Sequence, residues 1–296
     1  MFSLPVNYDL PVYRPPSEAK SLILQITVGC SWNRCAFCEM YSSKRFSIRK
    51  EEDIFEDIRQ TANTCPDTKK IFLADGDALV LPAEKLLKIL GEINRAFPDI
   101  NRVSSYALPS NIIKKSPRQL KALNDAGLKL IYLGIESGSD ELLKKAGKNE
   151  TQASTIEGLL KAKDAGFKSS VMILNGLGGL KYSNIHAVNS AEILNAVQPE
   201  FASTLVVSFP SGEDRFRKSF GNDYMPLNQK QLFEEQKTLI THLELKSTVF
   251  RSDHASNYLS LKGNLNRDKE KLLSQIQNAI DHPDTAGLRE EWQRGL

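Results

Sequence analysis

The stretch LILQITVGCSWNRCAFC, residues 22–38, decides how the rest of the chain is interpreted. Residues 22–28 are apolar and rich in β-branched side chains, and Gly29 ends the run, a pattern typical of a buried strand. Three of the four cysteines follow directly, namely Cys30, Cys35 and Cys38. Thiolates are soft ligands that suit iron–sulfur clusters, zinc or copper(I). The stretch therefore predicts a strand with a metal site after its C-terminal end.

A disulfide explains these cysteines poorly, because three is an odd number and no secretory signal precedes them. The N-terminus lacks a positively charged start followed by an apolar core. We therefore expect a reducing, cytoplasmic environment. No stretch approaches the roughly 20 apolar residues that span a bilayer, and a formal net charge of +3 does not argue for a nucleic-acid partner.

A local basic run follows the third cysteine and comprises Lys44, Arg45, Arg49 and Lys50. One interpretation is a solvated face. The other is that the positive charge offsets the negative charge of a thiolate-bound cluster, or meets an anionic substrate.

Apolar runs and helical periodicities alternate along the rest of the chain. The predicted strands cover residues 22–28, 71–74, 102–106, 128–135, 169–174 and 201–208. The predicted helices cover residues 51–64, 86–97, 117–126, 140–145, 151–165, 184–197 and about 232–243. Six strands alternating with helices predict an α/β fold, a partial (β/α)6 TIM-like barrel with right-handed crossovers. Ligands of such folds bind at the C-terminal ends of the strands.

The two ends of the chain differ from this core. Residues 1–20 are rich in proline and polar side chains and predict an extended arm. The barrel then covers residues 21–245, and residues 246–296 form a C-terminal extension. Its segment from Arg251 to Tyr258 is dense in polar side chains and suggests a lid, with the candidate catalytic residues Asp253 and His254.

Histidine 254 is interpreted as an acid, a base or a substrate anchor, because histidine titrates near neutral pH. A lone histidine is also commonly a structural group, and that alternative stays open. The three other histidines lie on predicted helices or their ends and are interpreted as structural or solvent-facing, namely His186, His242 and His282.

Three kinds of metal site fit the cysteines to different degrees. Structural zinc normally takes four protein ligands, and no second cysteine pair is present. Plant-type ferredoxins have the spacing Cys-x4-Cys-x2-Cys with a distant fourth cysteine, which Cys65 fits loosely. A cysteine at the end of an amphipathic helix is, however, commonly a small buried hydrophobe. A four-iron cluster held by only three thiolates leaves one iron open for a substrate or cofactor, as catalytic metal sites do.

A strand followed by GCSWNRCAFC and a run of βα units resembles the radical S-adenosylmethionine superfamily. In that family three cysteines hold a [4Fe–4S] cluster, and S-adenosylmethionine chelates the fourth iron. The resemblance implies both cofactors, with Cys30, Cys35 and Cys38 as ligands and Phe37 as the aromatic residue near the adenine. The prevailing family spacing is Cys-x3-Cys-x2-Cys, so the four residues between Cys30 and Cys35 mark a subgroup.

Two further stretches support the resemblance. Asp75-Gly76-Asp77 looks like a variant of the family's Gly-Gly-Glu stretch that receives the methionine amine, in which Asp77 would keep the acidic charge and Asp75 replaces a glycine. Asp and Gly are also ordinary in a tight turn. Ile135–Ser139 is similar to the Gly-x-Glu-x-Gly-Ser stretch of the branch that contains methylthiotransferases and coproporphyrinogen dehydrogenase relatives. Glu136, followed by Ser137, would then meet the ribose hydroxyls, and Ser139 would cap the next helix.

The resemblance also implies weaker contacts to S-adenosylmethionine. Lys148 would meet the methionine carboxylate, with a solvated lysine as the alternative. Ser104 and Ser105 would contact methionine or ribose. Asn175 and Gly176 begin a glycine-rich turn that would lie beside the adenine, although loop flexibility explains the glycines nearly as well.

The implied mechanism is that of a radical enzyme. An external one-electron donor such as flavodoxin or ferredoxin reduces the cluster, and cleavage of S-adenosylmethionine gives a 5′-deoxyadenosyl radical that abstracts hydrogen from a small-molecule substrate. The extra cysteines of auxiliary-cluster maturases are missing and no cobalamin-binding domain fits before Leu22, which disfavours a methylthiotransferase or a cobalamin-dependent methylase. The alternative is an iron–sulfur electron-transfer or cluster-carrying protein that uses Cys65 as a fourth ligand.

Overall fold

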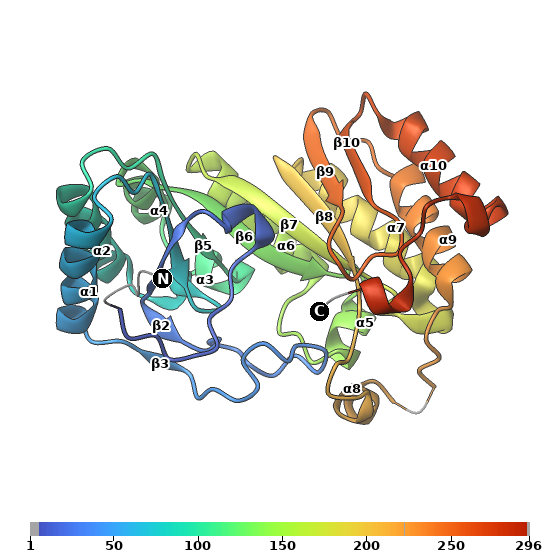
Figure 1. Cartoon of the computed structure of the whole chain (residues 1–296), viewed down its shortest axis with the longest axis horizontal. Coiled ribbons are helices and arrows are strands. Elements are labelled where there is room, and N and C mark those ends of the chain that lie inside the picture. The colour runs from blue at the N-terminus through green and yellow to red at the C-terminus, as the bar shows by residue number, and fades with distance from the viewer. Residues whose placement is uncertain (1–5, 222, 295–296) are drawn as a thin grey trace. The chain divides into compact units, whose positions relative to one another are not determined.

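The computed structural model describes residues 6–221 and 223–294, and the fold divides into two compact units. Unit 1 holds the chain up to Asn33, Met40–Leu133 and Glu157–Ser169. Unit 2 holds Arg34–Glu39, Gly134–Ile156 and the chain from Ser170 onward. Figure 1 shows the ribbon with its element labels.

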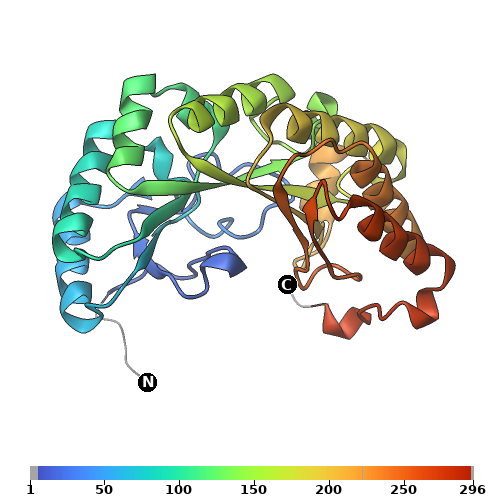
Figure 2. The ribbon, with the colours of Figure 1, turned by 90° about the horizontal axis from the view of Figure 1, so that it is seen from above.

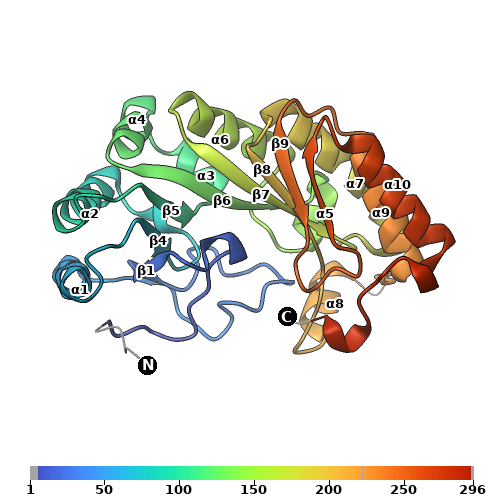
Figure 3. The same ribbon diagram turned by 45° about the horizontal axis from the view of Figure 1, so that its top comes forward.

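Unit 1 is built on parallel strands in the order β1, β4, β5 and β6. Their bounds are β1 Leu22–Gln25, β4 Lys70–Ala74, β5 Arg102–Tyr106 and β6 Leu128–Glu136, of which the last three residues belong to unit 2. The helices are α1 Glu51–Thr64, α2 Ala83–Ala96, α3 Pro109–Ile113 and α4 Pro117–Asp125. Helices α1, α2 and α4 lie on one face of the sheet, and the N-terminal arm lies on the other (Figure 3).

Unit 2 continues the alternation with β7 Lys168–Asn175, β8 Phe201–Val206, β9 Thr248–Ser252 and β10 Leu261–Leu265. Strands β7, β8 and β9 pair in parallel, and β10 runs antiparallel to β9. The helices are α5 Asp140–Lys145, α6 Gln152–Asp164, α7 Gly179–Val197, α8 Asp214–Phe220, α9 Gln229–Thr241 and α10 Lys269–Asp281. Residues 157–164 of α6 and the first two residues of β7 belong to unit 1. Helix α9 packs against α7 and α10 on one face of these strands (Figure 2).

Local sequence explains where several helices begin. Ser116 and Gln119 form a capping box at the start of α4, with Pro117 at the first helical position. Asn228 and Gln231 form the equivalent box at the start of α9. Three acidic residues occupy the first turn of α1, where they complement the helix dipole.

The predicted α/β fold is confirmed, and the predicted strands and helices lie close to those observed. The predicted strand 22–28 divides, because β1 ends at Gln25 and β2, Thr27–Val28, turns to pair antiparallel with β3, Ser47–Ile48. The short helices α3 and α8 were not predicted, since five and seven residues are too few for a clear helical period. Strands β9 and β10 also lie in the predicted extension, where dense polar side chains obscured the alternation.

The N-terminal arm is integrated into unit 1. Its described part is irregular apart from one 3-10 turn, Pro16–Glu18. The Tyr8 hydroxyl donates to the Ile23 carbonyl, so the arm follows β1. The Glu18 carboxylate is fully buried and accepts hydrogen bonds from Tyr132 at 2.7 Å and Arg102 at 2.6 Å. Residues 1–5 of the predicted arm lie outside the described residues.

Candidate functional site

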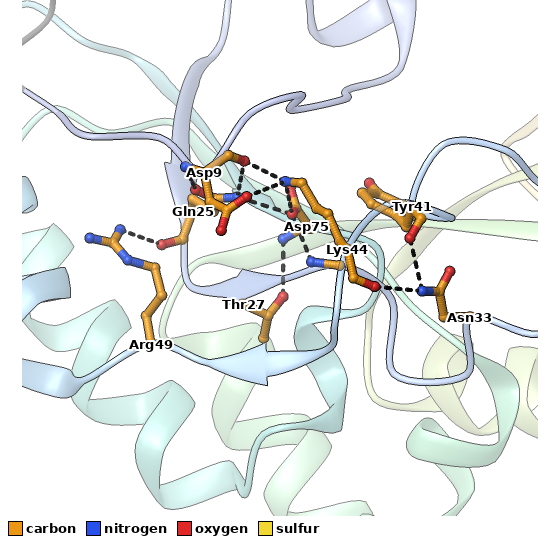
Figure 4. A network of polar contacts seen from close by, with 9 residues as sticks. Asp9, Gln25, Thr27, Asn33, Tyr41, Lys44, Arg49 and Asp75 are labelled. Atoms are coloured by element: carbon orange, nitrogen blue, oxygen red, sulfur yellow. Dashed lines mark hydrogen bonds and ion pairs between the residues drawn. The ribbon is translucent and has the colours of Figure 1, made fainter.

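The beginning of the cysteine loop, residues 29–38, is anchored within unit 1 by Asp75. The Asp75 Oδ2 accepts hydrogen bonds from the Gly29 N–H at 2.9 Å, from Gln25 Nε2 at 3.0 Å and from Lys44 Nζ at 2.9 Å. Lys44 also donates to the Asp9 carbonyl of the arm, and Figure 4 shows these side chains converging. A buried ion pair therefore fixes the residue that precedes Cys30.

The basic run divides into two parts. Lys44 is buried against Asp75, and Arg49 pairs with Asp57 at 2.5 Å, so the interpretation as a solvated face is wrong for these two. Arg45 and Lys50 are exposed. Two of the four cations therefore hold the fold of unit 1.

The turn Asp75-Gly76-Asp77 contacts the loop at two more points. A Cβ on Gly76 would lie 2.8 Å from the Cβ of Cys30, so only glycine permits this approach. The Asp77 carboxylate accepts hydrogen bonds from Ser31 Oγ at 2.7 Å and Asn111 Nδ2 at 2.5 Å. Burial raises the pKa of Asp77 to about 6, although these bonds and one from the Leu108 N–H favour the charged form.

Asn33 accommodates the long spacing between the first two cysteines. It adopts a left-handed conformation with φ of 46°, which asparagine tolerates better than most residues. Its side-chain amide donates to the carbonyls of Tyr41 at 2.8 Å and Lys44 at 3.0 Å. The gap between Cys30 and Cys35 thus has a defined local structure up to Asn33.

Ser104 and Ser105 lie on β5, and both are fully buried. Ser104 Oγ donates weakly to the Ile71 carbonyl at 3.4 Å. Ser105 Oγ has no hydrogen-bond partner among the described residues. Since a buried hydroxyl ordinarily finds a partner, Ser105 is the better ligand candidate of the two.

The end of the cysteine loop, Arg34–Glu39, belongs to unit 2 and rests on residues 146–148. The Ala36 N–H donates to the Ala146 carbonyl at 2.8 Å. A Cβ on Gly147, whose φ is +72°, would lie 2.8 Å from the Arg34 carbonyl oxygen, so glycine is required there. Phe37 packs against an apolar cluster that includes Leu142.

Glu136 and Lys148 form a second buried ion pair in unit 2, with 3.2 Å between Oε1 and Nζ. The Lys148 side chain is 6% exposed, so the alternative of a solvated lysine is wrong. Burial alone would lower the pKa of Lys148, but Glu136 and Cys35 more than offset this and raise it. Glu136 has a φ of 65°, and a Cβ on Gly134 would lie 1.8 Å from its Oε1.

The two serines after Glu136 have structural partners. Ser139 caps α5 by accepting a hydrogen bond from the Leu142 N–H, which confirms the predicted cap. Ser137 Oγ lies 2.8 Å from His186 Nδ1 on α7. His186 is buried, and burial lowers its pKa to about 4, so it is a neutral structural group. The two other predicted structural or solvent-facing histidines, His242 and His282, lie at the C-terminal ends of α9 and α10.

The Asn175–Gly176 turn is held by α9. The Gly176 N–H donates to Glu235 Oε1 at 2.6 Å, and Asn175 Nδ2 donates to the Leu232 carbonyl at 3.1 Å. Glu235 is a residue that the sequence reasoning missed, although it occupies the apolar stripe of α9 three residues after Leu232. Its second carboxylate oxygen is buried without a hydrogen-bond partner among the described residues.

A cavity of about 190 Å³ opens beside Gly176, after the ends of β7 and β8. Its walls are mostly apolar and include the aromatic rings of Phe209, in the loop after β8, and Tyr224, in the loop after α8. The lining residues are Gly176, Val206, Val207, Ser208, Phe209, Glu213, Tyr224, Pro226, Leu227 and Leu232.

Asp253 and His254 lie in the loop between β9 and β10. Asp253 pairs with Lys262 at 2.9 Å, and His254 Nδ1 accepts from the Ser256 N–H at 3.1 Å. Burial and the Arg289 guanidinium lower the pKa of His254, although Asp253 acts in the opposite direction. These partners describe a well-packed loop, and a catalytic role for either residue stays a prediction.

The polar density around these residues has a packing explanation. Ser252 and Asn257 are buried and bond one another, and both are linked to Thr204 on β8. Gln236 of α9 joins the same network through Ser252 at 2.8 Å. The side chains that suggested a lid therefore connect β8, β9 and α9.

Cys65 lies apart from the loop within unit 1. It caps the C-terminus of α1 and precedes β4, whereas Cys30 follows the C-terminal ends of β1 and β2. Because β1 and β4 are parallel, Cys65 lies at the N-terminal ends of the strands and Cys30 at their C-terminal ends. The length of β4, about 17 Å at 3.3 Å per residue, separates these two ends. Cys65 is therefore not placed to complete a ligand set with Cys30.

The chemistry of the donor set fits an iron–sulfur cluster. None of the four cysteines forms a disulfide, and all are half-buried. Among the described residues, no three Cys, His, Asp or Glu side chains lie close enough together to hold a metal ion, and the three loop cysteines are no exception. The fit therefore rests on the three loop thiols and on the two sets of contacts that hold the loop.

Fold and site together define an α/β protein whose first parallel strand leads into a cysteine-bearing loop. The family model described as the Radical SAM superfamily matches residues 24–189, more than half of the chain. The chain belongs to this superfamily. Its members bind a [4Fe–4S] cluster and S-adenosylmethionine, so the predicted family, enzyme class and cofactors are confirmed at this level.

Individual relatives cover part of the chain. The heme chaperone HemW of Bacillus subtilis is 29% identical over 179 residues, which are 60% of this chain and 46% of that protein. The chain thus spans less than half of this curated relative. Coproporphyrinogen III oxidase (HemN) from Escherichia coli, a radical SAM enzyme, matches 88% of this chain and 58% of its own with a TM-score of 0.60 at 14% identity.

A third match concerns the cofactors. The radical S-adenosylmethionine methyltransferase TsrM from Kitasatospora setae, solved with cobalamin and a [4Fe-4S] cluster bound, has a TM-score of 0.50 at 19% identity. It covers 62% of this chain and 36% of its own. These two structural likenesses show the fold alone.

Within the described residues, no helix is long and apolar enough to cross a membrane.

Proposed function

We propose that this chain is a radical S-adenosylmethionine enzyme whose Cys30, Cys35 and Cys38 hold a [4Fe–4S] cluster. The supporting observation is the loop with three thiols within nine residues, which lies inside the segment matched by the Radical SAM family model, residues 24–189. When bound, the cluster and S-adenosylmethionine supply a 5′-deoxyadenosyl radical that removes a hydrogen atom from the substrate. The chain's own residues bind, orient and shield these groups.

Glu136 and Lys148 are proposed to bind the polar parts of S-adenosylmethionine. A carboxylate accepts from ribose hydroxyls, and a buried ammonium group pairs with the methionine carboxylate. The left-handed backbone of Glu136 supports this role, because such strain concentrates at functional sites. Ser105, with its unsatisfied hydroxyl, is proposed as a further contact.

Asp77 is proposed to receive the methionine amine, as the resemblance implies. Its Oδ1 accepts only a long bond of 3.3 Å from the Leu108 N–H among the described residues, so acceptor capacity is left. Asp75 is assigned instead to the support of the loop. The cavity beside Gly176 is proposed for the adenine ring, since apolar walls suit a flat heterocycle.

The partners follow from this chemistry. We propose a small-molecule substrate, an external one-electron donor such as flavodoxin or ferredoxin, and a reducing cytoplasmic location in which the thiols persist. The lid role of the extension, residues 246–296, also stays a proposal. The alternative of a four-cysteine carrier is disfavoured by the position of Cys65 at the other edge of the unit 1 sheet.

The test is anaerobic reconstitution of the purified chain with iron and sulfide. We expect about four irons per chain and release of 5′-deoxyadenosine from S-adenosylmethionine under strong reductant. Cys30→Ala, Cys35→Ala and Cys38→Ala should each abolish both, whereas the matched control Cys65→Ala should keep both. Iron loss in Cys65→Ala with no cleavage by the intact chain would instead support the carrier.

A further inference from the structure

Ser211 and Arg215, in the segment that follows β8, form hydrogen bonds with the last part of the cysteine loop. Within unit 2, Arg215 Nε donates to the Ala36 carbonyl at 3.0 Å, and Arg215 Nη2 donates to the Cys38 carbonyl. Ser211 Oγ donates to Glu39 Oε2 at 2.8 Å. One guanidinium thus spans three loop residues, including the third cysteine.

The arginine is presented from a fixed support. Helix α8 buries Phe216 and Phe220, and their rings pack together at 5.2 Å between centroids. Ser219 Oγ donates to the Lys145 carbonyl at 2.7 Å, and Lys145 Nζ donates back to the Phe220 carbonyl at 3.0 Å. Because α8 is held by its core face and by these bonds, the side chain of Arg215 starts from a defined position.

Arginine suits this task better than other residues. Its planar guanidinium carries fixed donors, so it can orient two carbonyl groups at once. Hydrogen bonds from a charged donor are also stronger than neutral ones. An exposed arginine usually contributes little through ion pairing. Here, however, the two acceptors are backbone carbonyls, one of Ala36 and one of Cys38 itself.

We propose that Arg215 is a positioning residue for the cluster loop, which fixes the peptide groups around Cys38 and places a positive charge next to the backbone of that cysteine. This inference rests on the proposed function, since it concerns the same cysteines. A charge at this position stabilises the more negative, reduced cluster, because reduction adds negative charge. Loss of Arg215 should therefore loosen the loop and lower the reduction potential.

Arg217 provides a matched control on the same helix. Its guanidinium donates to Glu213 at 2.8 Å and to the Tyr224 carbonyl at 2.8 Å. None of these partners belongs to the cysteine loop. Arg217→Gln therefore removes the same charge from α8 and leaves the bonds to Ala36 and Cys38 in place.

The first measurement uses the chain without cluster. Amide hydrogen exchange of the peptide that contains residues 34–39 should be faster in Arg215→Gln than in the wild type, on the order of tenfold for two lost charge-assisted bonds. The peptide from α1 serves as an internal reference and should not change. Arg217→Gln should leave exchange of residues 34–39 as in the wild type.

The second measurement uses the reconstituted protein. Arg215→Gln should hold less iron and show a more negative midpoint potential than Arg217→Gln, and Arg215→Lys should restore most of the potential but only part of the exchange protection. Equal exchange and equal potential in Arg215→Gln and Arg217→Gln would overturn the inference. If the wild type takes up no iron, the proposed function fails, and the exchange comparison still decides whether Arg215 holds the loop.

Discussion

Each unit contains a buried lysine–carboxylate pair, Lys44–Asp75 in unit 1 and Lys148–Glu136 in unit 2, but the two pairs differ in their surroundings. In unit 1, Asp75 Oδ2 accepts hydrogen bonds from Lys44, from Gln25 and from the Gly29 N–H, so the pair bonds directly to the loop backbone. In unit 2, Glu136 has a positive φ and Lys148 as its hydrogen-bond partner among the described residues. The first pair supports the loop backbone, whereas the second is the pair that we propose to bind a ligand.

Replacing Lys44 should give the largest effect and tests whether the unit 1 pair supports the fold. Lys44→Met leaves the fully buried Asp75 without its cation, which should lower the free energy of unfolding by about 3–5 kcal/mol. Urea denaturation of the protein without cluster measures the change. Lys69→Met, which removes the exposed partner of Asp99, is the control and should cost ~0–1 kcal/mol. A similar small loss in both variants would show that the Asp75 pair does not support the fold.

Gly147→Ala tests the support at the other end of the loop. The new Cβ would meet the Arg34 carbonyl at 2.8 Å on a backbone with φ of +72°, so we expect a loss of about 2–3 kcal/mol from strain and displacement. Gly287→Ala separates these causes, because Gly287 has φ of +67° and open space around it. Its loss should be about 1 kcal/mol. Equal losses in the two variants would mean that the approach to Arg34 adds nothing.

Lys148→Met sharpens the assignment of the second pair to ligand binding. If Lys148 meets the methionine carboxylate, loss of the charged bond should weaken S-adenosylmethionine binding about tenfold or more, or at least 1.4 kcal/mol. Calorimetric titration of the reconstituted protein measures this. Lys44→Met, where it folds, should bind with nearly wild-type affinity. The reverse ranking of the two variants would exchange the roles assigned to the two pairs.

Glu235 adds a pH-dependent test within unit 2. Burial raises its pKa to about 7 from an ordinary value of 4.5, although the Gly176 N–H and Ser183 favour the charged form. The folded state therefore keeps a proton that the unfolded state has lost between these values, so stability falls as pH rises from about 4.5 to about 7. His186 acts oppositely between its pKa of about 4 and its ordinary 6.5.

The variant Glu235→Gln tests the pair that Glu235 forms with His186, because His186 Nε2 lies 3.7 Å from Glu235 Oε1 and the two groups titrate together. Gln can still accept the Gly176 N–H and does not titrate. Its stability relative to the wild type should increase by up to about 1.4 kcal/mol for each pH unit within this window. Thermal unfolding at pH 5, 6, 7 and 8 gives the trend. A stability difference that is constant with pH would show that Glu235 is not protonated in the folded state.

The sequence predicted the fold well because most elements are long and strongly periodic. The bounds of α1 agree with the prediction, since its apolar residues recur at helical spacing and a proline-containing turn follows it. The bounds of β5 agree as well, although this strand is largely polar. The sequence also singled out Glu136 and Gly76 through a family resemblance. The resemblance matches Asp77, and not Asp75, to the family's acidic residue, but it does not show that Asp75 bonds to Lys44 and Asp77 to Ser31.

Contacts between residues distant in sequence were not predictable from spacing. Arg215 lies 177 residues from Cys38, and nothing in the local pattern of α8 marks it as different from Arg217. Glu235 was likewise not predictable, because it lies on a helix with an ordinary amphipathic pattern. His186 is interpreted from the sequence as structural or solvent-facing, and the structure shows it buried beside Ser137. The polar segment near His254 has two explanations that composition does not separate, because buried polar networks and active sites have similar compositions.

The N-terminal arm has a practical consequence for where the protein can be shortened. The family model begins to match at residue 24, yet Tyr8 bonds to Ile23, and Glu18 satisfies Arg102 and Tyr132 in the interior of unit 1. A chain trimmed to the family boundary would leave these two partners without their carboxylate. The unit that must be expressed for study is therefore longer than the segment by which the family is recognised.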